Sequence, residues 1–266
     1  MRISFKNAEK IARHILPAQF FPESDYDYLF DFDRGNDIYR CLPKNLKIKN
    51  MKILDLGAGI GTVTAYFSKL HAKVVAVEKD KRFAVILKEL RKENNLDFQI
   101  FGNDFLKLQA KRKFDLIICN DVLEHVKDKE PFVRKMNSVL KNGGLAFVKF
   151  PNIKSFVQYV SRDHLLLPFP LSKKIMKKLD VYNIKKKDFL FLLSKCGFEP
   201  FDVTKEYFVK RKINKKMFKN SFSKRFGINL WKIMRRNQIL AQISLYHAPQ
   251  IVILAKKVEI NAADNN

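Results

Sequence analysis

Residues 53–61 read Ile-Leu-Asp-Leu-Gly-Ala-Gly-Ile-Gly, which combines an acidic side chain with three glycines at alternate positions. A short apolar stretch precedes the glycines and an amphipathic stretch at 62–70 follows them. The pattern predicts a turn between a strand and a helix, where glycines let the backbone turn tightly and approach a ligand. A dinucleotide fold favours Gly-x-Gly-x-x-Gly, but Thr62 or Thr64 stands at the sixth position here. Asp55, two residues before the first glycine, suits a ligand that carries an amino group better than a pyrophosphate.

Two further acidic residues stand where buried strands are expected to end. The apolar run 74–77 is typical of a parallel strand covered on both faces, and Glu78 follows it directly. A third strand is expected at 98–101, and Asp104 lies in the loop after it. Open α/β sheets bind ligands at the carboxyl ends of their strands, so both acids should face the ligand. The alternative for Glu78 is a solvated residue at a strand end, which the neighbouring glycine turn disfavours.

A second cluster of chemically useful residues follows the fourth expected strand, at 114–119. The chain reads Asn-Asp-Val-Leu-Glu-His-Val over residues 120–126. Asp121, Glu124 and His125 are spaced so that a helical or turn backbone places them on one side. They offer general bases or oxygen and nitrogen metal ligands at the same edge as the glycine turn.

This series of strands, acids and turns over residues 51–151 resembles the class I methyltransferases, which bind S-adenosylmethionine (SAM). The resemblance implies that Asp55 lies near the amino acid part of SAM and that Glu78 accepts from both ribose hydroxyls. It also implies that Asp104 accepts from the adenine amino group while Phe105 lies against the ring. The cofactor-binding residues implied in this way are Asp55, Gly57, Ala58, Gly59, Gly61, Glu78, Lys79, Asn103, Asp104, Phe105 and Asn120.

The 120–126 segment narrows the kind of methyltransferase. The first half of the chain, with Gly-Ala-Gly-Ile-Gly-Thr and Val-Glu-Lys-Asp, resembles the ribosomal-RNA adenine dimethylases. However, the segment lacks the two prolines and the aromatic residue with which nucleobase enzymes hold a flipped base. Together with Leu-Lys-Asn-Gly-Gly and Phe-Pro-Asn further on, it resembles the small-molecule methyltransferases, including the ubiquinone-pathway O-methyltransferases.

Methyl transfer from a sulfonium requires in-line alignment, and an oxygen nucleophile also requires a general base or a metal. His125 is the nearest candidate base, with Glu124 and Asp121 as further catalytic candidates. In the ubiquinone-type enzymes this motif reads Glu-x-x-Glu-His and binds a divalent cation. The resemblance therefore makes Asp121, Glu124, His125 and His164 candidate ligands for Mg²⁺ or another divalent cation. The alternative is that Glu124 and His125 form a hydrogen-bonded pair that closes the pocket.

The elements that must position these residues alternate between strand and helix from Met51 to Phe150. This alternation predicts an α/β fold, and the resemblance implies a Rossmann-like doubly wound seven-stranded sheet, mostly parallel with an antiparallel last strand. The remaining expected elements are helices at 62–70, 81–94, 131–140 and 186–195 and strands at 145–150, 198–207 and 250–256. We divide the chain into an N-terminal helical, acidic and aromatic cap (1–45), a SAM-binding core (46–207) with a lid (151–187), a basic insertion (208–248), the last strand (249–258) and a disordered tail (259–266).

The formal net charge of the 266-residue chain is +25, and the charges are segregated. Residues 210–236 carry eleven Lys or Arg, and no Asp or Glu occurs between Tyr207 and Val258. This segregation favours a polyanionic partner. Residues 208–247 could contact an anionic membrane surface, with Trp231 at the interface, or RNA as the alternative. The other interpretation is that the segment covers an edge of the core and points its charges into solvent.

The remaining composition is that of a reduced cytosolic protein. The three cysteines are scattered, and no apolar run approaches the roughly 20 residues that a membrane span needs. We therefore expect a cytoplasmic protein with peripheral membrane contact. The leading hypothesis is SAM-dependent methyl transfer to an oxygen of a small or lipid-linked acceptor: a quinone precursor, a sugar or a glycolipid. The alternatives are an RNA ribose 2′-O-methyltransferase and a non-catalytic SAM-fold binding protein.

Overall fold

The computed structural model describes residues 3–16, 33–109, 113–152, 158–159, 166–167, 182, 184–210 and 250–259. His164, most of the expected lid and residues 211–249 of the basic insertion lie outside the described residues. Among the helices that the structure describes, none is long and apolar enough to cross a membrane.

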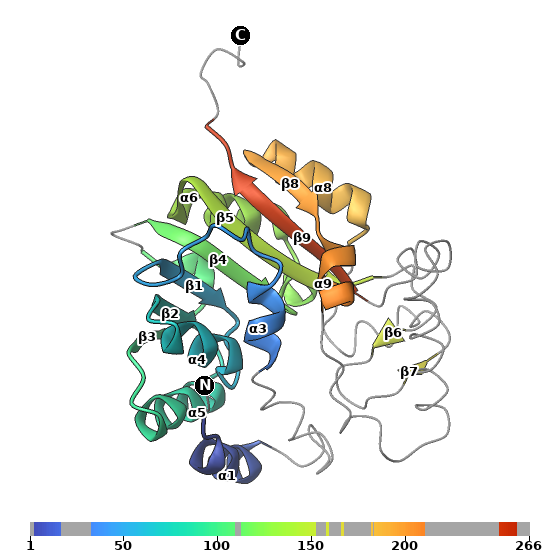
Figure 1. Cartoon of the computed structure of the whole chain (residues 1–266). Coiled ribbons are helices and arrows are strands. Elements are labelled where there is room, and N and C mark those ends of the chain that lie inside the picture. The colour runs from blue at the N-terminus through green and yellow to red at the C-terminus, as the bar shows by residue number, and fades with distance from the viewer. Residues whose placement is uncertain are drawn as a thin grey trace.

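A seven-stranded sheet forms the centre of the described structure (Figure 1). The strand order is β3-β2-β1-β4-β5-β9-β8. Strands β1 to β5 pair in parallel, whereas β9 is antiparallel to both β5 and β8, which confirms the predicted fold class. The strands are β1 (Lys52–Leu56), β2 (Lys73–Val77), β3 (Phe98–Phe101), β4 (Phe114–Asn120), β5 (Leu140–Pro151), β8 (Phe198–Asp202) and β9 (Gln250–Lys257). A separate short pair joins β6 (Gln158–Tyr159) to β7 (Leu166–Leu167).

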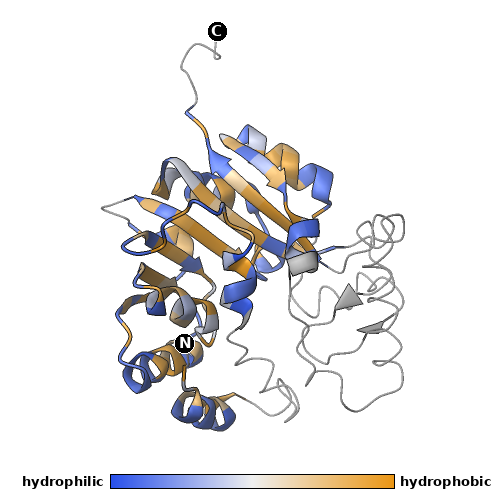
Figure 2. Ribbon diagram, viewed as in Figure 1, coloured by the Kyte–Doolittle hydropathy of each residue, from blue (hydrophilic) through white to orange (hydrophobic). Residues whose placement is uncertain are grey.

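Helices cover both faces of the sheet, because its central strands are apolar on both sides (Figure 2). In β4, Leu116 and Ile118 face the cluster that includes α4 and α5, whereas Ile117 and Cys119 face the cluster that includes α6 and α8. The helices are α1 (Lys6–Ile15), α3 (Asp33–Tyr39), α4 (Thr62–Lys69), α5 (Lys81–Glu93), α6 (Lys129–Val139), α8 (Lys186–Lys195) and α9 (Thr204–Lys210), with short 3-10 turns η1 (Phe105–Lys107) and η2 (Leu123–His125).

The predicted strand at 198–207 is wrong in its second half. Strand β8 ends at Asp202, and helix α9 begins at Thr204. The side chain of Asp202 accepts the backbone N–H of Thr204 at 3.0 Å, which turns the chain. The Thr204 hydroxyl then accepts the N–H of Val252 in β9 at 3.0 Å. These bonds start a helix at a position where the apolar residues alone indicate a strand.

Candidate active site

The glycine turn between β1 and α4 has three glycines with positive φ, and their surroundings differ. Gly57, Gly59 and Gly61 have φ angles of 64°, 54° and 88°. A Cβ on Gly57 would lie 2.4 Å from Val122 Cγ2, and one on Gly61 would lie 2.5 Å from Leu87 Cδ2. The nearest atom to a Cβ on Gly59 is 3.9 Å away. Gly57 and Gly61 therefore permit tight packing, whereas a Cβ on Gly59 would make only an ordinary contact, with the carbonyl oxygen of Gly57.

The carboxylate of Glu78 joins this turn to the end of β2. It accepts the N–H of Gly59 and the N–H of Asp80, each at 2.9 Å, and Glu78 is only 8% exposed. The adjacent turn is held as well, since the N–H of Ala58 donates to the carbonyl of Val77 at 3.0 Å. A carboxylate has about four lone-pair sites, so two backbone bonds orient Glu78 and leave capacity for two ligand hydroxyls. The predicted contact of Glu78 with the ribose of SAM is compatible with this arrangement and stays a prediction.

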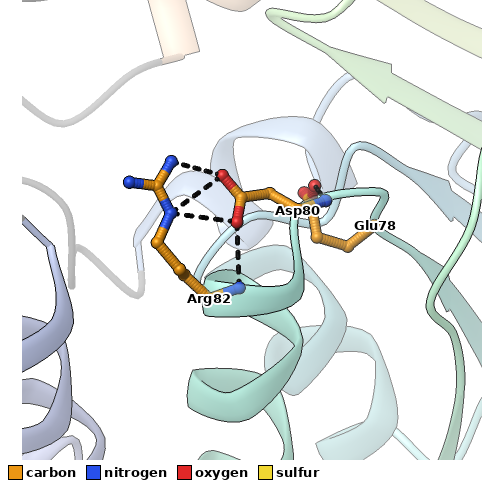
Figure 3. Close-up of polar contacts among 3 residues, drawn as sticks. All are labelled: Glu78, Asp80 and Arg82. Carbon is orange, nitrogen blue, oxygen red and sulfur yellow. Dashed lines mark hydrogen bonds and ion pairs between the residues drawn. The ribbon is translucent and has the colours of Figure 1, made fainter.

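The residues after Glu78 begin helix α5, as Figure 3 shows. Asp80 is the N-cap, and its carboxylate accepts the N–H of Arg82 at 2.9 Å and pairs with the Arg82 guanidinium at 2.6 Å. Lys79, which the resemblance places among the cofactor-binding residues, is exposed. The cap explains why α5 starts at Lys81. Because β2 ends at Val77, only three residues connect the strand to this helix.

Asp55, which the resemblance places near the amino acid part of SAM, is almost completely buried. It is 2% exposed, and its carboxyl group accepts the Thr64 hydroxyl at 2.5 Å. Burial raises the pKa of Asp55 to about 7, against the opposing effect of the hydrogen bond from Thr64. In the described structure Asp55 therefore ties β1 to α4, and its contact with the amino acid part of SAM stays a prediction.

The loop after β3 presents Asn103 and Asp104 at the surface. The N–H of Asp104 donates to Asn103 Oδ1, and Asp104 Oδ1 accepts the N–H of Leu106, each at 2.8 Å. Phe105 is 5% exposed, and its ring packs edge to face on Phe132 with centroids 5.1 Å apart. The role of Phe105 against the adenine stays a prediction. The exposed apolar side chain in this loop is Leu106, at 48%, which the sequence pattern did not single out.

At the end of β4, the backbone turns through Asp121, which has a φ of 58°. Its N–H donates to the carbonyl of Lys149 at 3.0 Å. Its carboxylate accepts from the Lys149 ammonium at 2.6 Å, from Gln250 Nε2 at 3.1 Å and from Asn120 Nδ2 at 3.3 Å. Lys149 is 4% exposed, so a buried ammonium already neutralises this carboxylate. The sequence pattern selected neither Lys149 nor Gln250.

Glu124 and His125 lie in η2 and differ in exposure. Glu124 is 8% exposed, and its Oε2 has no hydrogen-bond partner among the described residues, whereas His125 is exposed. Burial, and next the charge of Asp121, raise the pKa of Glu124 to about 8. Within the described part of the chain, no three His, Cys, Asp or Glu side chains gather to hold a metal ion. Since Lys149 also occupies the carboxylate of Asp121, the described residues of this turn do not fit a divalent cation.

Comparisons with known proteins agree with this fold. A family model described as "Methyltransferase domain" matches residues 54–148. The fold is similar to phosphoethanolamine N-methyltransferase 2 of Haemonchus contortus, with a TM-score of 0.59 and 16% identity over 98% of this chain and 61% of that one. It is equally similar to a putative sarcosine dimethylglycine methyltransferase of Galdieria sulphuraria, with a TM-score of 0.59 and 12% identity over 97% and 99% of the two chains. The fold is thus that of the methyltransferases.

The sequence relatives are more specific. The chain is 31% identical over 208 residues to the ubiquinone biosynthesis O-methyltransferase of Pelagibacter ubique, covering 71% of this chain and 85% of that protein. The mitochondrial ubiquinone biosynthesis O-methyltransferase of Dictyostelium discoideum is 27% identical over 131 residues, 45% of this chain and 40% of that protein. The chain belongs to the class I SAM-dependent methyltransferases of the ubiquinone O-methyltransferase type.

Proposed function

We propose that this chain transfers the methyl group of SAM to a hydroxyl oxygen of a quinone precursor, either free or lipid-linked. The observation that carries the proposal is the similarity to the Pelagibacter ubique enzyme, which spans 85% of that protein. It is supported by a basic side chain, His125, and two carboxyl groups at the end of β4, in a turn that contacts the glycine turn through Val122.

The chain would hold SAM along the carboxyl ends of β1 to β4. The methyl group bound to the sulfonium sulfur of SAM is the electrophile. Glu78 would accept from the two ribose hydroxyls, beside the Gly59 backbone that its carboxylate already binds. Asp104 would accept from the adenine amino group, and the side chain of Leu106, which is exposed, would lie against the ring.

On the acceptor side, we assign two roles to residues 120–126. They align the acceptor hydroxyl with the methyl group, and one of their side chains accepts the proton of that hydroxyl. Alignment of the oxygen with the S–CH₃ bond supplies much of the rate. Burial raises the pKa of Glu124 to about 8, which favours its protonated form, so we assign the proton-accepting role to the exposed His125. No step requires a divalent cation, in keeping with the engagement of Asp121 by Lys149.

We propose further that a lipid-linked acceptor is met at an anionic membrane surface through residues 208–247. The support is the sequence: it has eleven Lys or Arg at 210–236, and Trp231 stands in a stretch whose residue pattern is that of an amphipathic helix. The segment beyond Lys210 lies outside the described residues until Gln250.

The function is tested by offering methyl-labelled SAM and the full chain to separated lipid, polar-metabolite and RNA pools. We expect label in the lipid or metabolite pool, on a product that survives mild alkali, because methyl ethers do and methyl esters do not. The Glu78→Ala variant at the same low SAM concentration is the control and should label weakly. Label confined to RNA would favour ribose methylation, and label in no pool would refute the proposed acceptor class.

A further inference from the structure

The Lys149 ammonium sits between two oxygen atoms that point to it from different strands. Its Nζ lies 2.6 Å from Asp121 Oδ2 at the end of β4 and 3.1 Å from Gln250 Oε1 at the start of β9. Gln250 Nε2 in turn donates to Asp121 Oδ1 at 3.1 Å, which closes a ring of three side chains. Carboxylate and amide oxygens directed at one point are the ligands that Mg²⁺ and Mn²⁺ take in proteins. Here that point holds a protein ammonium.

Lys149 is an unusual residue for this position, because it lies in the apolar part of β5 with 4% of its surface exposed. Lysine is almost never buried to this degree unless it is paired, since removing its charge from water is costly. The ring of Tyr207 in α9 lies 5.9 Å from Nζ, close enough for a favourable cation–π contact. The surroundings therefore accommodate a positive charge.

The ammonium also fixes the geometry of Asp121. The Asp121 backbone has a positive φ of 58°, which is uncommon outside glycine, although Asp adopts it more readily than most residues. Lys149 binds Asp121 through both its backbone and its side chain. The Lys149 carbonyl accepts the Asp121 N–H at 3.0 Å, and the Lys149 ammonium binds the Asp121 carboxylate. The turn that carries Glu124 and His125 starts from this fixed point.

We propose that Lys149 is a positioning residue that takes the place of a divalent cation beside the acceptor. Its ammonium neutralises Asp121 and holds the 120–125 turn, so the site carries a positive charge of its own and works without a metal. The inference rests on the proposed methyl transfer at the end of β4. An ion pair that served stability alone would be replaceable by two neutral side chains with little effect on the reaction.

The first experiment needs no acceptor and so is independent of the proposed function. Mn²⁺ binding is measured by electron paramagnetic resonance on the wild-type full chain and on Lys149→Ala, with thermal unfolding to establish that each is folded. We expect the wild type to bind no Mn²⁺ at millimolar concentration and Lys149→Ala to bind it, because the two oxygen ligands lose their ammonium. Lys149→Ala in which Gln250 is also changed to Leu should lose this binding. Mn²⁺ bound by the wild type, or not bound by folded Lys149→Ala, would overturn the proposal.

The second experiment measures turnover on the acceptor pool that labelled SAM identifies, with and without chelator. Wild-type turnover should be unchanged by chelator, and Lys149→Met should lose about tenfold or more of kcat while SAM affinity by calorimetry changes less than about twofold. Lys149→Arg keeps the charge and should retain more turnover than Lys149→Met. The double variant Asp121→Asn with Lys149→Met should regain thermal stability but not turnover. Loss of wild-type turnover in chelator, or recovery of turnover in the double variant, would contradict a positioning charge.

Discussion

Glu78→Ala is the most direct test of where SAM binds. In the proposed complex the carboxylate is the acceptor for two ribose hydroxyls, and the structure shows it oriented by N–H groups of Gly59 and Asp80 at 2.9 Å. Removing it leaves two hydroxyls without an acceptor, at a combined cost of about 2–3 kcal/mol in SAM affinity. The dissociation constant should therefore rise roughly 30- to 150-fold. Calorimetric titration with SAM measures this change.

Asp80→Ala is the matched control, because it disturbs the same corner of the fold without touching the proposed ligand. It removes the N-cap of α5, which should cost about 0.5–2 kcal/mol of stability, while the exposed pair with Arg82 contributes little. We expect both variants to lower the thermal unfolding midpoint and only Glu78→Ala to weaken SAM binding. Unchanged SAM affinity in Glu78→Ala, or an equal loss in Asp80→Ala, would show that the ribose has been placed wrongly.

Three further predictions concern the turn, the buried acid and the basic segment. Gly59→Ala and Gly143→Ala both force alanine into positive φ without a clash, so each variant should lose about 1–2 kcal/mol of stability. In calorimetry, only Gly59→Ala should also weaken SAM binding. Because the pKa of Glu124 is raised from 4.5 to about 8, the folded protein keeps a proton that the unfolded chain releases, and wild-type stability should fall as pH rises through that window. In urea unfolding, Glu124→Gln should lack the part of this fall that Glu124 causes, while the part due to Asp55, whose pKa is also raised, remains in both proteins. The stability of the variant relative to the wild type should therefore grow with pH, by a few kcal/mol in order of magnitude, and a difference that is constant with pH would refute the assignment. Residues 208–247 should confer salt-sensitive binding to anionic liposomes, and this binding should exceed binding to RNA. For single-stranded RNA, the logarithm of the binding constant falls with the logarithm of the salt concentration with a slope near −0.7 per phosphate neutralised. Binding to neither partner at physiological salt would mean that the charges only keep the segment solvated.

The parts of the fold that follow from local patterns could be predicted from the sequence. The apolar runs of β1, β2 and β4 predicted strands buried on both faces, and the glycines predicted the turn after β1, since both depend on residues close together in the chain. The end of β8 could not be predicted in this way. The turn from Asp202 to Thr204 is local, but Thr204 is also held by bonds to Val252, 48 residues further along the chain, and no local pattern reveals that partner.

The difference between local and distant partners also explains why the sequence suggested a metal ion beside Asp121, whereas the structure has the Lys149 ammonium there. Asp121, Glu124 and His125 lie within one short turn, so their spacing alone suggests ligands. The ammonium that competes for Asp121 comes from Lys149, 28 residues away, and the amide that completes the ring comes from Gln250, 101 residues from Lys149. Lys149 reaches this place because β5 pairs in register with β4 on one side and with the antiparallel β9 on the other. Since β9 follows the basic insertion, its register cannot be predicted from the β5 sequence. A metal motif recognised by spacing is therefore secure only when no buried cation reaches it from a neighbouring strand.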